Sequence, residues 1–213
     1  MAPTTSTVTL SPCPTPDTSC NNAGLQWAYY TALNGNGYPS DSSSFDPTLY
    51  EIDAPVINGT TRIISIPLTS DASGSTLFYG KGPEPLASFF VDHRGYFYPP
   101  QTGNYTFDYS YVDDAAYLWV GDLAYSGWNN TNYNEYGSWG TAAPSVQIFL
   151  TKDEYVPIRL AYGQGGGAGG LTVDIYAPDG ETVISSTSDT ASPYFVAFSC
   201  DGTAPKYPAW GAE

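Results

Sequence analysis

The strongest fold signal in this sequence lies in residues 95–121, GYFYPPQTGNYTFDYSYVDDAAYLWVG. Within it, residues 105–111 alternate aromatic and polar side chains, which is the period of two expected of a strand with one buried face. Asp113 and Asp114 follow side by side, and residues 116–120 resume an alternation. The pattern predicts two strands with a pair of carboxylates at the turn between them, a position that suits the binding of a cation or a sugar.

The rest of the sequence also indicates strands. Short β-branched and aromatic runs, bounded by Gly, Pro, Asn and Asp, predict strands at residues 62–66, 86–91, 146–150, 158–162, 171–176 and 195–198. Residues 21–33 are the best candidate for a short helix. Residues 1–20 are rich in Pro and Thr and indicate an extended lead-in held by cysteine. We therefore expect an all-β protein with a single domain over residues 21–213.

The composition argues against one class of partner. Only 13% of the residues are charged, and 21 acids face 6 bases, which gives a formal net charge of −15. Such a surface repels phosphate backbones, so we expect no nucleic-acid binding. It suits cation binding or a place in an acidic extracellular layer. The 19 tyrosines serve either a β-sandwich core or a surface that stacks on sugar rings.

Three sequons indicate a secreted protein. N-x-Thr motifs occur at Asn58, Asn104 and Asn129, and each is expected on an exposed segment that carries an N-linked glycan.

The start of the chain lacks the apolar region of a signal peptide, so we expect any such peptide to have been removed. No run of about 18 apolar residues is present, so we expect no membrane insertion.

The cysteines also indicate an extracellular setting. Cys13 and Cys20 lie near the start and Cys200 near the end, with none between. A disulfide from one early cysteine to Cys200 would clamp the two ends of the domain, and chain-entropy models predict a large gain in stability for so long a loop. We favour Cys20 as the partner, because Cys13 lies inside the proline-rich lead-in. A partner for the remaining thiol beyond Glu213 would make this chain a fragment.

The carboxylate pair and a glycine-rich segment together suggest a metal site. Successive residues on a regular strand point to opposite faces, so Asp113 and Asp114 share a ligand only where the backbone deviates, as at a cis peptide bond. Residues 163–170, GQGGGAGG, contain no Lys or Arg and precede a strand rather than a helix, which argues against a phosphate cradle. The Gln164 amide and nearby carbonyls would add oxygens for Ca²⁺. The alternative is a plain hairpin tip.

No catalytic set is evident in the sequence. Glycoside hydrolysis needs two carboxylates about 5–10 Å apart across the scissile bond, and adjacent aspartates do not provide that geometry. The one histidine, His93, has neither a Cys partner nor a G-x-S-x-G motif, and it suits a structural role better than that of a base. We therefore expect a binding protein rather than an enzyme.

Two segments resemble a known family. Residues 95–121 and the segment YVPIRLAYGQGGGAGGLTVDIYAPDG are similar to the PA14-like lectin domain of yeast flocculins and epithelial adhesins, especially its GLEYA-type branch. The resemblance covers most of residues 20–200, and the V-D-D block is its most specific part. It implies a PA14-type antiparallel β-sandwich whose long loops form a calcium site, in a secreted domain displayed on a fungal cell wall.

The resemblance also implies the ligands of that ion. Asp113 and Asp114, joined by a cis peptide bond, would both bind Ca²⁺, and Gln164 stands where the family usually has asparagine. The backbone carbonyls of Gly166 and Ala168 would complete the protein's share of the ligands. A terminal hexose would coordinate the same ion through two vicinal hydroxyls, so the side chains of Asp113, Asp114 and Gln164 would also face the sugar.

The sequence departs from the family in the glycine-rich segment, residues 163–170. Gln164 is one methylene longer than asparagine, and Gly and Ala stand where other members have aromatic or charged residues that shape specificity. Such a pocket would admit a bulkier sugar or an N-acetyl group. Trp128 and Trp139, in the irregular segment over residues 124–143, are candidates for a ring that stacks on the sugar, and we favour Trp128.

The resulting hypothesis is a calcium-dependent adhesin domain for terminal glycans of the mannose, galactose or N-acetylglucosamine type. We expect a monomer with weak affinity per site, and useful adhesion from many copies on the cell surface. The leading alternative is a structural cell-wall or toxin-associated module in which Ca²⁺ only stabilises the fold. The second alternative is an accessory domain of a glycosidase.

Overall fold

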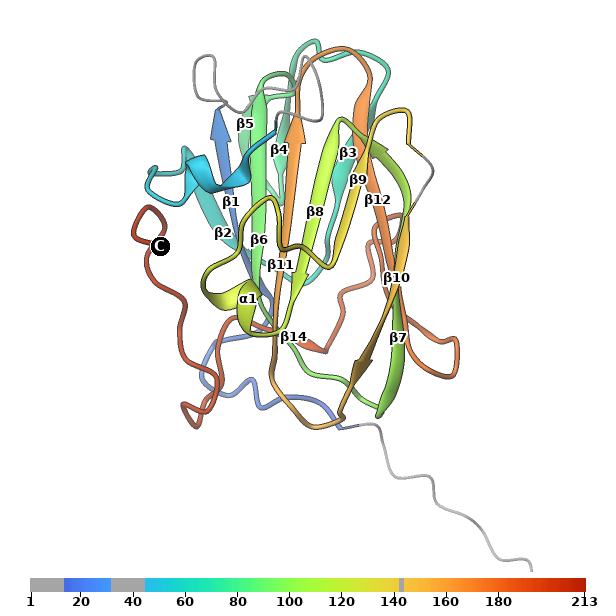
Figure 1. Cartoon of the computed structure of the whole chain (residues 1–213). Coiled ribbons are helices and arrows are strands. Elements are labelled where there is room, and N and C mark those ends of the chain that lie inside the picture. The colour runs from blue at the N-terminus through green and yellow to red at the C-terminus, as the bar shows by residue number, and fades with distance from the viewer. Residues whose placement is uncertain (1–13, 32–44, 142–143) are drawn as a thin grey trace, which may run out of the picture.

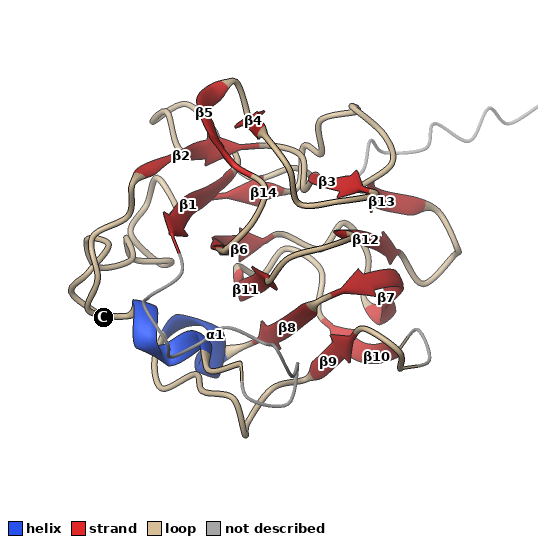
Figure 2. Ribbon diagram, turned by 90° about the horizontal axis from the view of Figure 1, so that it is seen from above, coloured by secondary structure: helices blue, strands red, loops and turns tan. Residues whose placement is uncertain are grey.

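The computed structural model describes residues 14–31, 45–141 and 144–213. Over these residues, two antiparallel sheets pack against each other, as Figure 1 shows from the side and Figure 2 from above. The all-β sandwich expected from the sequence is confirmed. No helix in these described ranges is long and apolar enough to cross a membrane.

The larger sheet, sheet A, has seven strands, and β14 pairs with β6 beside the main order. The main order is β2 (Ile57–Thr61), β1 (Leu25–Thr31), β6 (Phe89–Phe97), β11 (Val156–Gln164), β8 (Ala115–Val120) and β9 (Glu135–Ser138), with β14 at Phe195–Val196.

The second sheet, sheet B, has five strands, and β3 pairs with β12 beside the main order. The main order is β10 (Ser145–Leu150), β7 (Gly103–Asp113), β12 (Gly169–Tyr176) and β13 (Thr182–Ser185), with β3 at Ile66–Thr69. The smaller elements are the hairpin of β4 (Ser75–Phe78) and β5 (Lys81–Pro85), the 3₁₀ helix at Pro47–Tyr50 and α1 (Asp122–Tyr125).

The apolar residues form one core between the sheets and a second on the outer face of sheet A. Tyr105, Phe107 and Tyr109 of β7 point into the first core and are fully buried, as their alternation predicted. Tyr117 and Trp119 of β8 belong to the second core, which α1 and the C-terminal segment flank in Figure 2. The central strands of sheet A are therefore covered on both faces, and every residue of β6 is buried.

Burial on both faces explains where the sequence-based strand assignment was wrong. Residues 25–31 form β1 rather than part of a short helix, because a strand buried on both faces shows a continuous apolar run with no period of two. Residues 32–33 of that predicted helix lie outside the described residues. Residues 62–65 form the connection between β2 and β3, and β6 begins at Phe89 instead of residue 86.

The two ends of the domain are joined covalently. Cys20 forms a disulfide bond with Cys200, with Cα atoms 5.7 Å apart, while Cys13 and the first part of the lead-in lie outside the described residues. Cys20 precedes β1 and Cys200 follows β14. In Figure 1, β14 lies at the lower end of the sandwich.

After Cys200 the chain returns along the outer face of sheet A and is held there by buried charges. Glu213 forms ion pairs with Arg94 and Arg159, and Arg159 also pairs with Asp92. The ring of Trp210 lies 3.5 Å from the Arg94 guanidinium. Because both arginines are almost fully buried, the carboxylate of Glu213 compensates charge that has no access to water.

Candidate functional site

The two aspartates lie where the chain crosses from one sheet to the other. Asp113 is the last residue of β7 in sheet B, and Ala115 begins β8 in sheet A, so Asp114 stands alone between the sheets. The peptide bond between Asp113 and Asp114 is cis, as the family resemblance implied. Asp113 is buried and Asp114 is half-buried. The carboxylate pair thus occupies the rim of the sandwich at the upper end of Figure 1.

A second crossing lies beside the first. The glycine-rich turn, residues 165–168, links β11 of sheet A to β12 of sheet B. The strand register places Gly163 opposite Ala115 and Gly170 opposite Asp113, which brings the two crossings together. The backbone N–H of Gly165 donates a hydrogen bond to Oδ2 of Asp114. Of the glycine-rich segment 163–170, only residues 165–168 form the turn, which contacts the aspartates, and the remainder belongs to β11 and β12.

Gln164 fills the space beneath this turn. Its side chain is almost fully buried, and Nε2 donates to the carbonyl oxygen of Ala168 over 3.1 Å. Gly169 has no side chain to obstruct it, whereas a Cβ atom there would lie 1.9 Å from Gln164 Oε1. Asp113, Asp114, Gln164 and Ala168 are thus brought together, and Gly166 is exposed in the same turn.

A buried tyrosine ties the two crossings to each other, and the sequence analysis missed it. The hydroxyl of Tyr162 lies 2.5 Å from the carbonyl oxygen of Asp113 and 2.6 Å from Oε1 of Gln164. Tyr111 adds a second phenol, whose hydroxyl donates to Oδ2 of Asp113 over 3.2 Å. Tyr162 is two residues before Gln164 on the same face of β11, so strand periodicity alone could have identified it.

The site is electrostatically suited to a cation. Burial, opposed by the hydrogen bond from the Gly165 N–H and assisted by the adjacent Asp113 carboxyl, raises the pKa of the Asp114 carboxyl to about 6. Within the described ranges, no lysine or arginine forms an ion pair with either carboxylate. In the described part of the chain, two acidic groups and nearby carbonyl oxygens therefore lie together without an ion pair to a lysine or arginine.

The preference for Trp128 as the stacking ring is wrong. Trp128 is only 4% exposed, belongs to the core on the outer face of sheet A, and lies 4.2 Å from the Arg159 guanidinium. Its indole N–H donates to Oε2 of Glu213 over 3.2 Å. It follows α1, at the end of β8 away from the aspartates (Figure 1), so it cannot contact a ligand bound there.

Trp139 is the tryptophan that lies beside the site. It directly follows β9, is 69% exposed, and donates its backbone N–H to the carbonyl oxygen of Asp114 over 2.7 Å. A groove of about 290 Å³ runs beside it and is also lined by Tyr111, Val112 and Thr141. The rim that carries the paired carboxylates therefore also carries an exposed ring, and sugar sites combine such a stacking surface with polar groups.

The sequons differ in their surroundings. Asn58 and Asn104 are exposed on β2 and β7, as expected for glycosylation. Asn129 is half-buried, and its Oδ1 accepts hydrogen bonds of 2.9 and 2.5 Å from the backbone and hydroxyl of Thr131. Their occupancy stays a prediction.

The chain is similar to fungal cell agglutination and flocculation proteins. The GLEYA domain model matches residues 89–177. The chain is 35% identical over 108 residues to the putative cell agglutination protein pfl4 of Schizosaccharomyces pombe, a match that covers 47% of the chain and 18% of pfl4. It is 32% identical over 126 residues to the flocculation protein FLO1 of Saccharomyces cerevisiae, covering 52% of the chain and 8% of FLO1. The chain therefore matches only a small part of these relatives.

A solved structure shares the fold. The A domain of epithelial adhesin 6 from Candida glabrata superposes with a TM-score of 0.64 at 23% identity, covering 84% of the chain and 88% of that domain. A two-sheet sandwich with an aspartate pair at the crossing between its sheets is a PA14-type domain. The chain belongs to the GLEYA family, the PA14-like lectin domains of fungal flocculins and adhesins. The resemblance stated from the sequence is thereby confirmed.

Proposed function

We propose that this domain binds terminal glycans through a calcium ion held by Asp113, Asp114, Gln164 and the carbonyls of Gly166 and Ala168. The observation that carries the proposal is the contact between the two crossings, which brings these residues to one rim of the sandwich. They supply carboxylate, amide and carbonyl oxygens, which are the ligands that Ca²⁺ prefers.

The hydrogen bonds around Gln164 support a cation at this place. A tyrosine hydroxyl has one proton, yet that of Tyr162 lies within 2.6 Å of two carbonyl oxygens. Both contacts are satisfied if the Gln164 amide is turned over, because its nitrogen then donates to the hydroxyl. The amide oxygen of Gln164 would then face the carbonyl oxygen of Ala168. Two such acceptors repel each other unless a cation lies between them, so this arrangement supports a bound cation.

The remaining residues would position the sugar. When bound, the ion offers coordination sites to two hydroxyls of a hexose and neutralises the carboxylates of Asp113 and Asp114. The Asp114 carboxylate is held by the Gly165 N–H, and the ring of Trp139 offers an apolar face beside it. The turn carries only small residues at 166–168, which leaves room for an N-acetyl group or a second sugar.

The known relatives suggest which glycans to test first. The A domain of epithelial adhesin 6 was solved in complex with Galβ1-3GlcNAc, and that of epithelial adhesin 9 in complex with Galβ1-4GlcNAc. We propose galactose-terminated glycans as the leading ligands and keep mannose and N-acetylglucosamine ends in the comparison. We also propose that the domain is a monomer displayed on the cell wall and that it has no catalytic activity. Many copies on one surface would then combine their weak affinities for glycans.

A glycan array with and without a calcium chelator tests this function. We expect calcium-dependent binding that Asp114→Asn abolishes, while the exposed matched control Asp122→Asn binds like the wild type. Binding that survives chelation would refute the metal-bridged mechanism. If no glycan on the array binds while Ca²⁺ still raises the melting temperature, the alternative of a structural module stabilised by Ca²⁺ would be favoured instead.

A further inference from the structure

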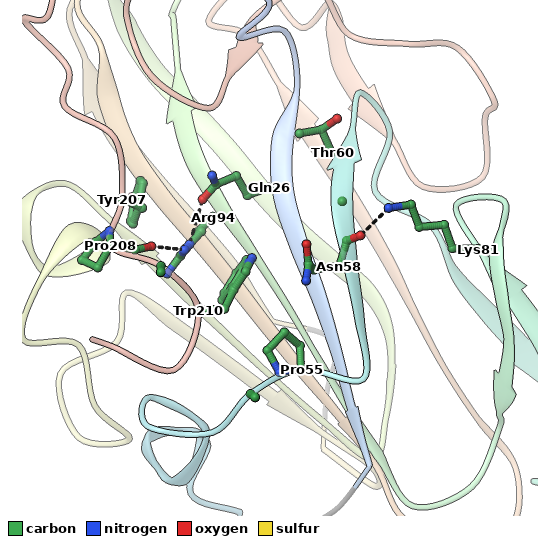
Figure 3. A pocket seen from close by; sticks show the side chains of 12 residues that line it. Gln26, Pro55, Asn58, Thr60, Lys81, Arg94, Tyr207, Pro208 and Trp210 are labelled. Carbon is green, nitrogen blue, oxygen red and sulfur yellow. Dashed lines mark hydrogen bonds between the residues drawn. The ribbon is translucent and has the colours of Figure 1, made fainter.

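A groove on the outer face of sheet A is unrelated to the aspartate site. Its volume is about 790 Å³, and it lies between the edge of the sheet and the C-terminal segment (Figure 3). The side chains used below are Gln26, Asn58, Thr60, Lys81, Arg94 and Trp210. One of them, Asn58, is the acceptor residue of a glycosylation sequon.

Strand geometry directs this sequon into the groove. Among the described strands, β2 is an edge strand of sheet A and pairs with β1 alone. Asn58 and Thr60 are exposed and share the groove face. Gly59 faces the opposite way, because a Cβ atom there would lie 3.1 Å from Nε1 of the buried Trp27. Lys81 donates to the carbonyl oxygen of Asn58 over 2.6 Å and fixes its backbone. The acceptor amide is thus accessible and held toward the cavity.

The opposite wall of the groove is a fixed aromatic ring. The indole of Trp210 lies 3.5 Å from the Arg94 guanidinium and is half-buried. Arg94 is itself held by Gln26 Oε1 at 3.0 Å, by the carbonyl oxygen of Pro208 at 2.5 Å and by Glu213. Figure 3 shows the Trp210 ring between Arg94 and Asn58. One side of the ring is therefore covered by the cation, and the groove gives access to the rest.

We propose that the first N-acetylglucosamine of a glycan on Asn58 lies in this groove and packs against Trp210. The apolar face of a pyranose matches an indole surface, and Gln26 and Thr60 add polar groups on the groove face for the hydroxyls and the acetamide. Because the sugar is attached covalently, its effective concentration at the ring is high and a weak contact suffices. This role is independent of calcium and of any glycan bound at the aspartate pair.

Asn104 provides an internal reference in the same molecule. It is also exposed on a strand of a sheet, but the hollow beside it is lined by Thr106, Gln147 and Tyr176 and contains no tryptophan. A glycan on Asn104 has the same chemical linkage but no tryptophan ring stacked on an arginine beside it. The two sites can therefore be compared under identical conditions.

The test measures how fast each glycan is released from the folded protein. The domain is secreted from a yeast host, and peptide:N-glycosidase is added without denaturant, with glycopeptide mass spectrometry at intervals. Stacking on Trp210 shields the Asn58 linkage, so we expect its release to be about tenfold slower than that at Asn104, equivalent to about 1.4 kcal/mol of protection. Trp210→Ala should remove most of this difference and leave the Asn104 rate unchanged.

Three results would overturn the proposal. They are an Asn58 without glycan in the secreted protein, equal release rates at Asn58 and Asn104, and a difference in rate that persists in Trp210→Ala. An unchanged Asn104 rate shows that the variant is folded. If Trp210→Ala is not secreted, Trp210→Phe decides: a faster release at Asn58 alone supports the proposal, and an unchanged rate overturns it.

Discussion

The backbone N–H of Trp139 donates a hydrogen bond of 2.7 Å to the carbonyl oxygen of Asp114. This bond ties the residue after β9 to the crossing between β7 and β8, so the backbone that carries the exposed indole keeps a fixed position relative to the carboxylate pair. The ring itself is 69% exposed and is therefore accessible to a ligand bound at this rim.

Replacing this ring should weaken glycan binding without affecting the fold. We expect Trp139→Ala to reduce glycan affinity by a factor between about 2 and about 13, the range that corresponds to an aromatic contact of about 0.5–1.5 kcal/mol. Calcium affinity and melting temperature should stay unchanged, because the bond to Asp114 uses the backbone. Trp128→Ala is the contrasting variant: it should destabilise the fold by about 3–5 kcal/mol through loss of a buried ring. Titration calorimetry and thermal melting distinguish the two. Equal glycan affinity in Trp139→Ala and wild type would refute the stacking role.

Two glycines of the second crossing should respond differently to alanine. A Cβ atom at Gly169 meets the end of the Gln164 side chain, whereas one at Gly166 has no neighbour within 4 Å. We expect Gly169→Ala to displace the Gln164 amide and to lower calcium affinity at least about tenfold, the factor given by 1.4 kcal/mol. Gly166→Ala should bind calcium like the wild type. Calorimetric calcium titration of both variants checks this, and equal affinities would exclude Gln164 as a ligand.

Stability should fall as the pH rises, because of Glu135. Burial raises the pKa of its carboxyl to about 8 from 4.5, with a further contribution from Asp108, and neither of its oxygens has a hydrogen-bond partner among the described residues. Below pH 4.5 the group is protonated in both the folded and the unfolded chain. Between pH 4.5 and about 8 only the unfolded chain releases the proton, so the free energy of unfolding decreases.

The variant Glu135→Gln isolates this effect. At pH 8 it should melt at least about 2 °C above the wild type, the shift that 1 kcal/mol gives in a domain of this size. At pH 4 the two proteins should differ less, because both carry a neutral side chain at this position. Melting curves across this range, recorded with a chelator present, provide the measurement. A constant difference at all pH values would contradict the assignment.

The disulfide should contribute strongly to stability. Cys20 and Cys200 are 180 residues apart, and loss of a native bond in a secreted domain costs about 2–5 kcal/mol. We expect the double change to Ala at both positions to lower the free energy of unfolding by that amount in urea titrations. Calcium affinity should remain unchanged in the folded double variant, since the bond is remote from the aspartates. A double variant as stable as the wild type would show that the C-terminal segment is held by its ion pairs alone.

The sequence predicted what depends on local pattern. The alternation of residues 105–111 identified β7, and the V-D-D block located the crossing between the sheets, because both signals lie within a few consecutive residues. The strand β1 was missed because its residues are covered on both faces, and this depends on segments distant in the sequence.

The choice between two tryptophans shows the same limit. Trp128 and Trp139 lie in one segment of similar composition, and only the tertiary partners separate them. Trp128 is buried by Arg159 and by Glu213, which is 85 residues further along the chain. The residues adjacent to Trp128 and Trp139 in the sequence do not indicate the contact of Trp128 with Arg159 and Glu213. The same applies to the groove at Asn58, whose aromatic wall comes from the last residues of the chain.

The covalent link between Cys20 and Cys200 has a mechanical consequence. Tension applied through the backbone before Cys20 and after Cys200 is carried by the sulfur–sulfur bond. The strands from β1 to β14, which lie between the two cysteines, are outside the path of that load. The part of the domain between Cys20 and Cys200 therefore adds a fixed length to any tether that passes through it. The rim with the paired aspartates keeps its shape while the chain on either side is stretched.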